Sequence, residues 1–164
     1  AHGDLRDAFE GSPDNHACVI RRLVEAGVGL AQVGIRAVTG EEHAYIREAG
    51  ICTVYAQEAV LEPVGSWLPR VLEALPEDVY VTVDLDVLDP AIMPATGTPE
   101  PGGLDWYRTL SVLRGVAEQR RIVGFDVVEL SPMPGNVAPD FLAAKLVYKL
   151  LGYAFLLGPA AGRG

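Results

Sequence analysis

With 164 residues, of which 49% are hydrophobic, the chain has the length of one ordinary domain and enough apolar side chains for a buried core. A formal net charge of −9, with only 13 Lys and Arg, argues against binding to nucleic acid and to anionic membrane surfaces, because both need a basic face. A cation is therefore a more natural ligand than a phosphate backbone or a lipid headgroup.

Helical and extended patterns alternate from the start of the chain. Residues 16–27, "HACVIRRLVEAG", predict an amphipathic helix, and residues 29–36, "GLAQVGIR", predict a strand. A second helix is expected over residues 41–50, where a glycine closes it, and a second strand over residues 51–57.

The second half of the chain continues this alternation. A helix is predicted over residues 64–75 and a strand over residues 79–88, after which Pro and Gly residues at 94–103 indicate a loop. The remaining elements are a helix, a strand and a closing helix at residues 105–121, 122–130 and 140–157. Val- and Ile-rich strands between helices predict an α/β fold with three layers, in which helices cover both faces of a parallel sheet. In such folds functional residues gather at the carboxyl ends of the strands.

Two cysteines and an apolar C-terminal tail bear on the location of the protein. Cys18 and Cys52 lack the spacing of a redox pair and lie in apolar segments, which indicates buried thiols in a reducing compartment. No signal-peptide pattern is present, and the tail is too short and too interrupted by lysines to span a bilayer. We expect a cytoplasmic protein.

Three acids, Asp84, Asp86 and Asp89, stand at the end of the strand predicted over residues 79–88. Side chains alternate along a strand, so Asp84 and Asp86 are expected on the same side. Two carboxylates on a largely buried strand repel each other and lose hydration unless a cation compensates, which favours a divalent metal. The alternative is acids that face water or cap a turn, and Asp89, which precedes a proline, fits that alternative well.

Two further sets of polar residues strengthen the metal hypothesis. His2 and Asp4 share the same spacing near the start of the chain, and Glu129 ends another strand. Each of these is common at exposed positions and alone indicates little. Together, His2, Asp4, Asp84 and Asp86 make one imidazole and three carboxylates, a hard donor set typical of Mn²⁺ or Mg²⁺.

The stretches "AHGD" at residues 1–4 and "DLDVLDPAIMPATGTPEPGG" at residues 84–103 resemble motifs of the ureohydrolases, the arginase and agmatinase family of two-manganese enzymes. The first is similar to the family's Asp-Ala-His-x-Asp motif from its second position onward. The second is similar, over its whole length, to Asp-x-Asp-x-x-Asp-Pro and the Pro/Gly loop that follows. The resemblance extends through "DNHACVIRRL", "VGIRAVTGEEH" and "FDVVELSP" and so covers nearly the whole chain.

The resemblance implies roles for particular residues. The manganese ligands that it implies in this chain are His2, Asp4, Asp84 and Asp86. His16 matches the proton-shuttling histidine of the family, and Glu129 matches the acid that orients the guanidinium group of the substrate. Glu42 is expected near the distal end of the substrate.

The resemblance also implies a reaction, the hydrolysis of a small guanidino compound to urea and an amine. Arginase-like members carry an acid where this chain has Thr39, which favours a substrate without an amino acid head, such as agmatine. Guanidinobutyrate and arginine are the alternatives. Family members commonly form trimers or hexamers, so a homo-oligomer is expected, with no nucleic-acid or membrane partner.

Two metal ligands of the family are not found in this sequence, since the Gly-Gly-Asp-His motif and the first Asp of Asp-Ala-His-x-Asp are both missing. The resemblance therefore implies that residues 1–164 are the C-terminal part of a single ureohydrolase domain, with an arginase/deacetylase-like fold that is incomplete at the N-terminus. We expect weak or incomplete binding of the two Mn²⁺ ions by this chain alone.

Three other interpretations are open. A phosphatase of the haloacid dehalogenase type would use Asp84 as a nucleophile, but its motif belongs near the N-terminus and leaves the Pro/Gly loop unexplained. A zinc-dependent deacetylase would need Asp-x-His where this chain has His2 and Asp4. A non-catalytic scaffold with the same fold would tolerate the replacement of Asp84 and Asp86 by Asn.

Overall fold

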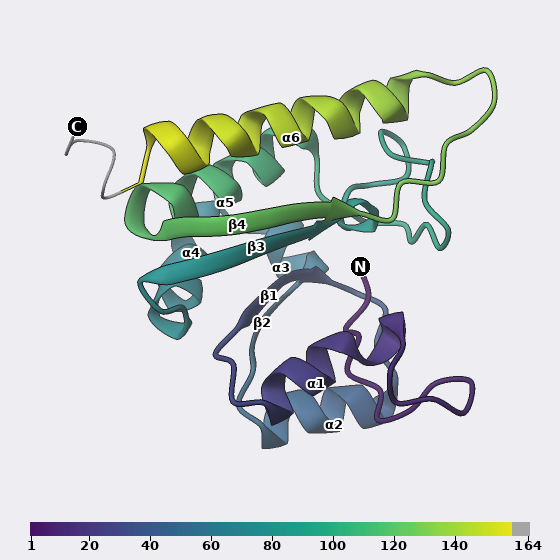
Figure 1. Cartoon of the computed structure of the whole chain (residues 1–164), viewed down its shortest axis with the longest axis vertical. Helices are drawn as coiled ribbons and strands as arrows, with labels where there is room; N and C mark the ends of the chain where they lie inside the picture. The colour runs from purple at the N-terminus through teal and green to yellow at the C-terminus, as the bar shows by residue number, and fades with distance from the viewer. Residues whose placement is uncertain (159–164) are drawn as a thin grey trace.

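Parallel strands form the centre of the computed structural model, which describes residues 1–158 (Figure 1). Strand β1 (Ala31–Ile35) pairs with β2 (Cys52–Tyr55), and β3 (Asp78–Asp84) pairs with β4 (Arg121–Val128), in both cases in parallel. The predicted parallel α/β fold is confirmed. Within the described residues the strands form two pairs rather than one continuous sheet.

The helices lie close to the predicted positions, with one addition. Their bounds, in chain order, are α1 (Val19–Glu25), α2 (Gly40–Glu48), α3 (Ala56–Leu61), α4 (Val64–Ala74), α5 (Trp106–Gln119) and α6 (Ala138–Leu156). Helix α3 was not predicted, and the strand expected over residues 51–57 ends at Tyr55. Ala56 and Ala59 are both buried, three residues apart, which is the spacing of one helix face.

Helices cover the two strand pairs differently. Helices α3 and α4 pack on β1 and β2, and Figure 1 shows α1 and α2 on the other side of that pair. Helices α5 and α6 cover one face of β3 and β4 around a core that includes Val83, Leu113 and Leu146. On the opposite face, the Asp126 carboxylate accepts hydrogen bonds from the hydroxyls of Tyr80 (3.0 Å) and Thr82 (2.6 Å), so Asp126 joins β3 to β4.

Strand β3 is shorter than predicted. The strand expected over residues 79–88 ends at Asp84, and Leu85–Val87 form a short 3-10 helix, η2. The Asp84 carboxylate accepts the main-chain N–H of Asp86 at 2.9 Å and so caps this turn. Leu85 and Leu88 are buried as turn residues, which explains why the apolar run reads as strand.

The two cysteines are both free thiols, and one of the two is buried as predicted. Cys18 is a buried free thiol, and Cys52 is a half-buried free thiol. In residues 1–158 we find no helix with the length and apolar character needed to cross a bilayer.

Candidate functional site

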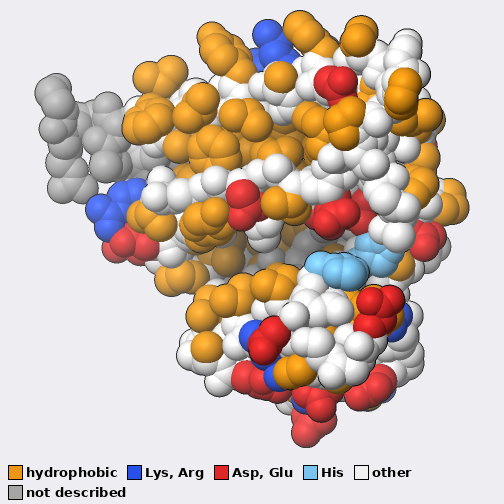
Figure 2. Space-filling model, turned by 45° about the vertical axis from the view of Figure 1, so that its right-hand side comes forward, with side chains coloured by type: hydrophobic (Ala, Val, Ile, Leu, Met, Phe, Trp, Pro, Cys, Tyr) orange, Lys and Arg blue, Asp and Glu red, His pale blue; other side chains and the backbone are white. Residues whose placement is uncertain are grey.

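A cavity of about 730 Å³ lies at the carboxyl ends of the strands. Every residue to which the family resemblance assigns a role lines it: His2, Asp4, His16, Glu42, Asp84, Asp86 and Glu129. Figure 2 shows histidine side chains, with acidic side chains nearby, beside the hollow between the two halves of the molecule. A groove of about 810 Å³ along α6 is mostly apolar and contains none of these residues, so we place the chemistry in the cavity at the strand ends.

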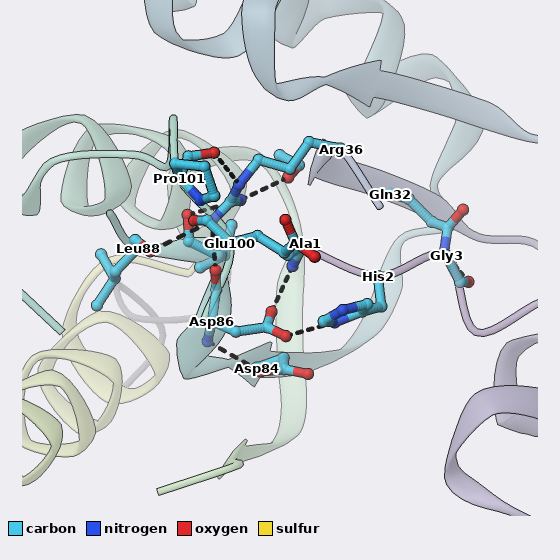
Figure 3. A network of polar contacts seen from close by, with 12 residues as sticks. Ala1, His2, Gly3, Gln32, Arg36, Asp84, Asp86, Leu88, Glu100 and Pro101 are labelled. Carbon is cyan, nitrogen blue, oxygen red and sulfur yellow. Dashed lines mark hydrogen bonds and ion pairs between the residues drawn. The ribbon is translucent and has the colours of Figure 1, made fainter. Parts of the chain in front are cut away.

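Asp86 is the most buried acid of the cavity, with only 2% of its surface exposed. Its carboxylate contacts the Ala1 ammonium and lies 2.6 Å from Nδ1 of His2 (Figure 3). Burial acts to raise the pKa of Asp86, whereas a hydrogen bond with the Asp84 side chain and the charge of His2 act to lower it. Asp86 and His2 therefore form a bonded pair inside the cavity.

In two other acids of the cavity, burial outweighs the nearby positive charge. Burial, together with the neighbouring Asp86, raises the pKa of Asp84 to about 7. Burial also raises the pKa of Asp4, although His2 opposes the shift. Burial is the larger cause in both cases, so these two carboxylates lose hydration when they are charged.

The four predicted metal ligands have the donor atoms that a hard divalent cation prefers. They supply three carboxylates and one imidazole, and all four line the same cavity. No three His, Cys, Asp or Glu side chains among residues 1–158 surround a common point as a closed ligand set. Instead, Asp86 and His2 bond to each other and Asp84 caps its own turn.

Strained backbone marks two residues of the cavity. Asp4 and Glu129 have φ angles of 52° and 66°, in the left-handed region that costs a non-glycine residue roughly 1–3 kcal/mol. The Asp4 carbonyl accepts the main-chain N–H groups of Ile20 (3.1 Å) and Arg21 (3.2 Å), which fixes it against α1. Such strain persists only where the surrounding structure enforces it, and it is common at functional sites.

Glu42 lines the cavity, but main-chain groups occupy both of its carboxylate oxygens. Oε2 accepts the N–H of Thr39 at 2.8 Å, and Oε1 accepts the N–H of Leu5 at 3.1 Å. The Thr39 hydroxyl accepts the N–H of Glu42 in return, which completes a capping box at the start of α2. Glu42 is 4% exposed and holds the segment next to Asp4. Its contact with a substrate stays a prediction.

Replacing Glu42 by Gln is expected to lower the free energy of unfolding by about 1–3 kcal/mol, because the amide has one acceptor oxygen for two buried N–H groups. Glu41→Gln is the control, since Glu41 is exposed on the same turn, and a change within about 0.5 kcal/mol is expected there. Denaturant unfolding of both variants measures the difference. An equal change in the free energy of unfolding for both variants would show that the hydrogen bonds from Leu5 and Thr39 do not stabilise the fold.

His16 and Glu129 are exposed at the cavity and free of strong partners in the described structure. His16 opens the short 3-10 helix η1 (His16–Cys18), which Asn15 caps, and its ring lies 5.7 Å from Phe9 in an edge-on arrangement. The end of β4 that carries Glu129 is held by the Pro/Gly loop, because Ser131 N–H donates to the Ala95 carbonyl at 2.8 Å.

Some residues in and near the Pro/Gly loop hold the loop in shape, and others line the cavity. Asp89 accepts the N–H groups of Ala91 (2.9 Å), Gly102 (3.0 Å) and Gly103 (3.0 Å), which agrees with its interpretation as a turn residue. Thr98 and Glu100, which the sequence did not single out, line the cavity. Their position in the loop directly after the acidic strand is the signal that could have found them.

Comparisons with known proteins match nearly the whole chain, including the residues that line the cavity. Residues 1–152 match the Arginase family. The chain is 44% identical over 154 residues to the N(1)-aminopropylagmatine ureohydrolase of Synechocystis sp., covering 93% of the chain and 50% of that protein. It is 39% identical over 152 residues to the agmatinase of Pyrococcus horikoshii, covering 93% of the chain and 52% of that protein.

Solved structures give the same picture. The agmatine ureohydrolase of Thermoplasma volcanium superposes with a TM-score of 0.83 at 32% identity, covering 94% of this chain and 52% of that one. The proclavaminate amidino hydrolase of Streptomyces clavuligerus superposes with a TM-score of 0.84 at 34% identity, covering 93% and 53% of the two chains. The chain thus spans about half the length of the relatives that it matches.

Proposed function

The chain belongs to the arginase family, and from this premise we propose that its cavity serves the manganese-dependent hydrolysis of a guanidino compound. One observation carries the proposal. Four potential ligands, an acid and a histidine from distant parts of the sequence line a single cavity at the strand ends. Their charge and burial suit a cationic cofactor and a cationic substrate.

In this proposal His2, Asp4, Asp84 and Asp86 hold Mn²⁺. When bound, Mn²⁺ lowers the pKa of water and supplies a hydroxide nucleophile at neutral pH. Glu129 accepts hydrogen bonds from the guanidinium group and orients its carbon toward the ligand wall. His16 moves a proton to the nitrogen of the leaving amine, so that urea and a primary amine are the products.

Agmatine is the substrate that we favour, with putrescine as the amine product. Relatives named agmatinase support it, and so does Thr39, a neutral residue whose hydroxyl caps α2. N(1)-aminopropylagmatine is the second candidate, because the Synechocystis relative with 44% identity carries that name. We further propose a cytoplasmic homo-oligomer, which the exposed apolar side chains of α6, among them Phe141 and Phe155, support.

Urea release tests the reaction and its substrate class. The chain is incubated with Mn²⁺ and, in turn, agmatine, N(1)-aminopropylagmatine, arginine and guanidinobutyrate. The expected result is slow, Mn²⁺-dependent urea release that is greatest for one of the first two compounds, slow because this chain supplies four of the ligands that the family implies. Absence of urea from all four compounds at saturating Mn²⁺ would overturn the proposal.

Replacing His16 by Asn is expected to lower kcat about 100-fold with little change in KM or in Mn²⁺ binding, since proton transfer contributes roughly that factor. His43→Asn is the matched control. His43 lies outside the cavity, where its Nδ1 is 2.9 Å from the Tyr55 hydroxyl, and its replacement should leave kcat unchanged. A rise in KM at constant kcat for His16→Asn would point to substrate binding instead of proton transfer.

A further inference from the structure

Arg36, the residue that follows β1, binds main-chain carbonyls from three separate segments (Figure 3). Nη2 donates to Asp86 (2.7 Å) and Glu100 (2.8 Å), and Nε donates to Pro101 (3.0 Å). Longer hydrogen bonds reach the carbonyls of Gly34 (3.2 Å), Val87 (3.4 Å) and Leu88 (3.4 Å). One guanidinium therefore ties the end of β1 to η2 and to the Pro/Gly loop.

No carboxylate in residues 1–158 forms a salt bridge with the half-buried guanidinium of Arg36. A charged group that loses hydration without an ion-pair partner is costly, and among the described residues carbonyl oxygens are its only hydrogen-bond partners. Five N–H donors in a rigid planar fork can reach carbonyls in several directions, whereas the ammonium of a lysine cannot reproduce that geometry. The contacts of Arg36 therefore fix main-chain positions.

The segments that Arg36 joins are walls of the cavity. The Asp86 carbonyl binds its guanidinium, while the Asp86 N–H donates to Asp84, so both acids belong to the same hydrogen-bonded network. The main-chain N–H of Arg36 donates to the Ala1 carbonyl at 2.8 Å, next to His2. On the far side, the Glu100 carbonyl anchors a loop whose residues line the cavity.

We propose that Arg36 is a positioning residue that sets the distance between the metal-binding wall and the Pro/Gly loop. Its side chain acts through the main chain of Asp86 and Glu100 and does not itself contact the substrate. This inference rests on the proposed function, because the wall that it positions is the one assigned to Mn²⁺.

Arg36→Lys tests the inference, with Arg108→Lys as the matched control. Arg108 also donates to two main-chain carbonyls of another segment, those of Ala59 (2.9 Å) and Glu62, but it lies outside the cavity. For Arg36→Lys we expect amide hydrogen exchange at residues 102–104 to be about tenfold faster, since the loop loses its clamp. Mn²⁺ binding, followed by the loss of the free-ion electron paramagnetic resonance signal, should weaken about tenfold, as it does when outer-shell partners are lost.

Arg108→Lys should leave both quantities unchanged, even if the two variants lose similar thermal stability. Exchange at residues 102–104 that stays within twofold of the unmodified chain, or Mn²⁺ affinity that is equal in the two variants, would overturn the inference. If the unmodified chain binds no Mn²⁺, the proposed function fails and hydrogen exchange alone decides the role of Arg36.

If Arg36→Lys does not fold, a second measurement on the unmodified chain still tests the inference. The amides of Gly102 and Gly103, in the clamped loop, should exchange more slowly than that of Asn136, which bonds to the Met133 carbonyl at 3.0 Å in a turn that Arg36 does not touch. Equal exchange at the two places would contradict a clamp.

Discussion

Simultaneous replacement of Asp84 and Asp86 by Asn is expected to abolish specific Mn²⁺ binding and to reduce urea release from agmatine by at least about 100-fold, because loss of an outer-shell partner alone costs 10–100-fold. The amides keep the shape of the side chains but remove two negative charges from the cavity. Isothermal titration with Mn²⁺ and the urea assay measure the two effects.

Asp126→Asn is the control for this double variant. Asp126 lies on β4 beside β3 and binds Tyr80 and Thr82 on a face that does not line the cavity. Its replacement should leave Mn²⁺ binding unchanged. Unaltered Mn²⁺ affinity in the Asp84→Asn, Asp86→Asn variant would instead support the scaffold interpretation, in which the fold is kept without a working site.

Gly103→Ala is expected to have the largest effect on stability, with a loss of about 3 kcal/mol, the upper part of the range for overpacking. A Cβ atom at Gly103 would lie 2.6 Å from the Leu88 carbonyl oxygen and closer still to two other main-chain atoms of Leu88 and Asp89. Backbone atoms cannot yield as a flexible side chain does. The Pro/Gly loop must therefore move away from the chain that follows β3.

The displacement would also reach the site, because Asp89 holds Gly102 and Gly103 while Leu104 N–H donates to the Val87 carbonyl at 3.0 Å. Thermal unfolding and Mn²⁺ titration of Gly103→Ala should both show a loss. Gly152→Ala in α6 is the control, since nothing lies within 4 Å of its added Cβ, and a gain of roughly 0.5–1 kcal/mol is expected from helix propensity. A Gly103→Ala variant as stable as the unmodified chain would contradict the tight approach of these segments.

The alternation of the sequence predicted the parallel α/β fold and nearly all of its helices and strands, because period and glycine placement are local signals. Hydrogen bonds between side chains and the main chain leave no such periodic pattern in the sequence. The cap that Asp84 places on Asp86 ended β3 early, against an apolar run that continues to Leu88. Helix α3 was missed because its short, buried face reads as the end of a strand.

The sequence predicted most of the residues that line the cavity, but it did not predict the hydrogen bonds that they form. Motifs singled out His2 near the start of the chain and Asp84 and Glu129 at strand ends, and the structure brings them to one cavity. What Glu42 and Arg36 do could not be read from the sequence. Each binds main-chain groups of segments far away in the chain, and only the folded chain shows which groups those are.

Membership in the arginase family decides against the phosphatase and deacetylase interpretations for this chain. The structure adds that Asp84 caps a turn and lies beside Asp86 in an acidic cavity. Burial raises the pKa of both Asp4 and Asp84, and a cation bound between such carboxylates would favour their charged forms.

The most direct measurement is the anomalous X-ray scattering of crystals of this chain soaked in Mn²⁺. If the cavity is a manganese centre, an anomalous peak should lie among the side chains of His2, Asp4, Asp84 and Asp86, and it should vanish in the Asp84→Asn, Asp86→Asn variant. Mn²⁺ density only at other places on the molecule, or a peak that survives the double replacement, would contradict the manganese site.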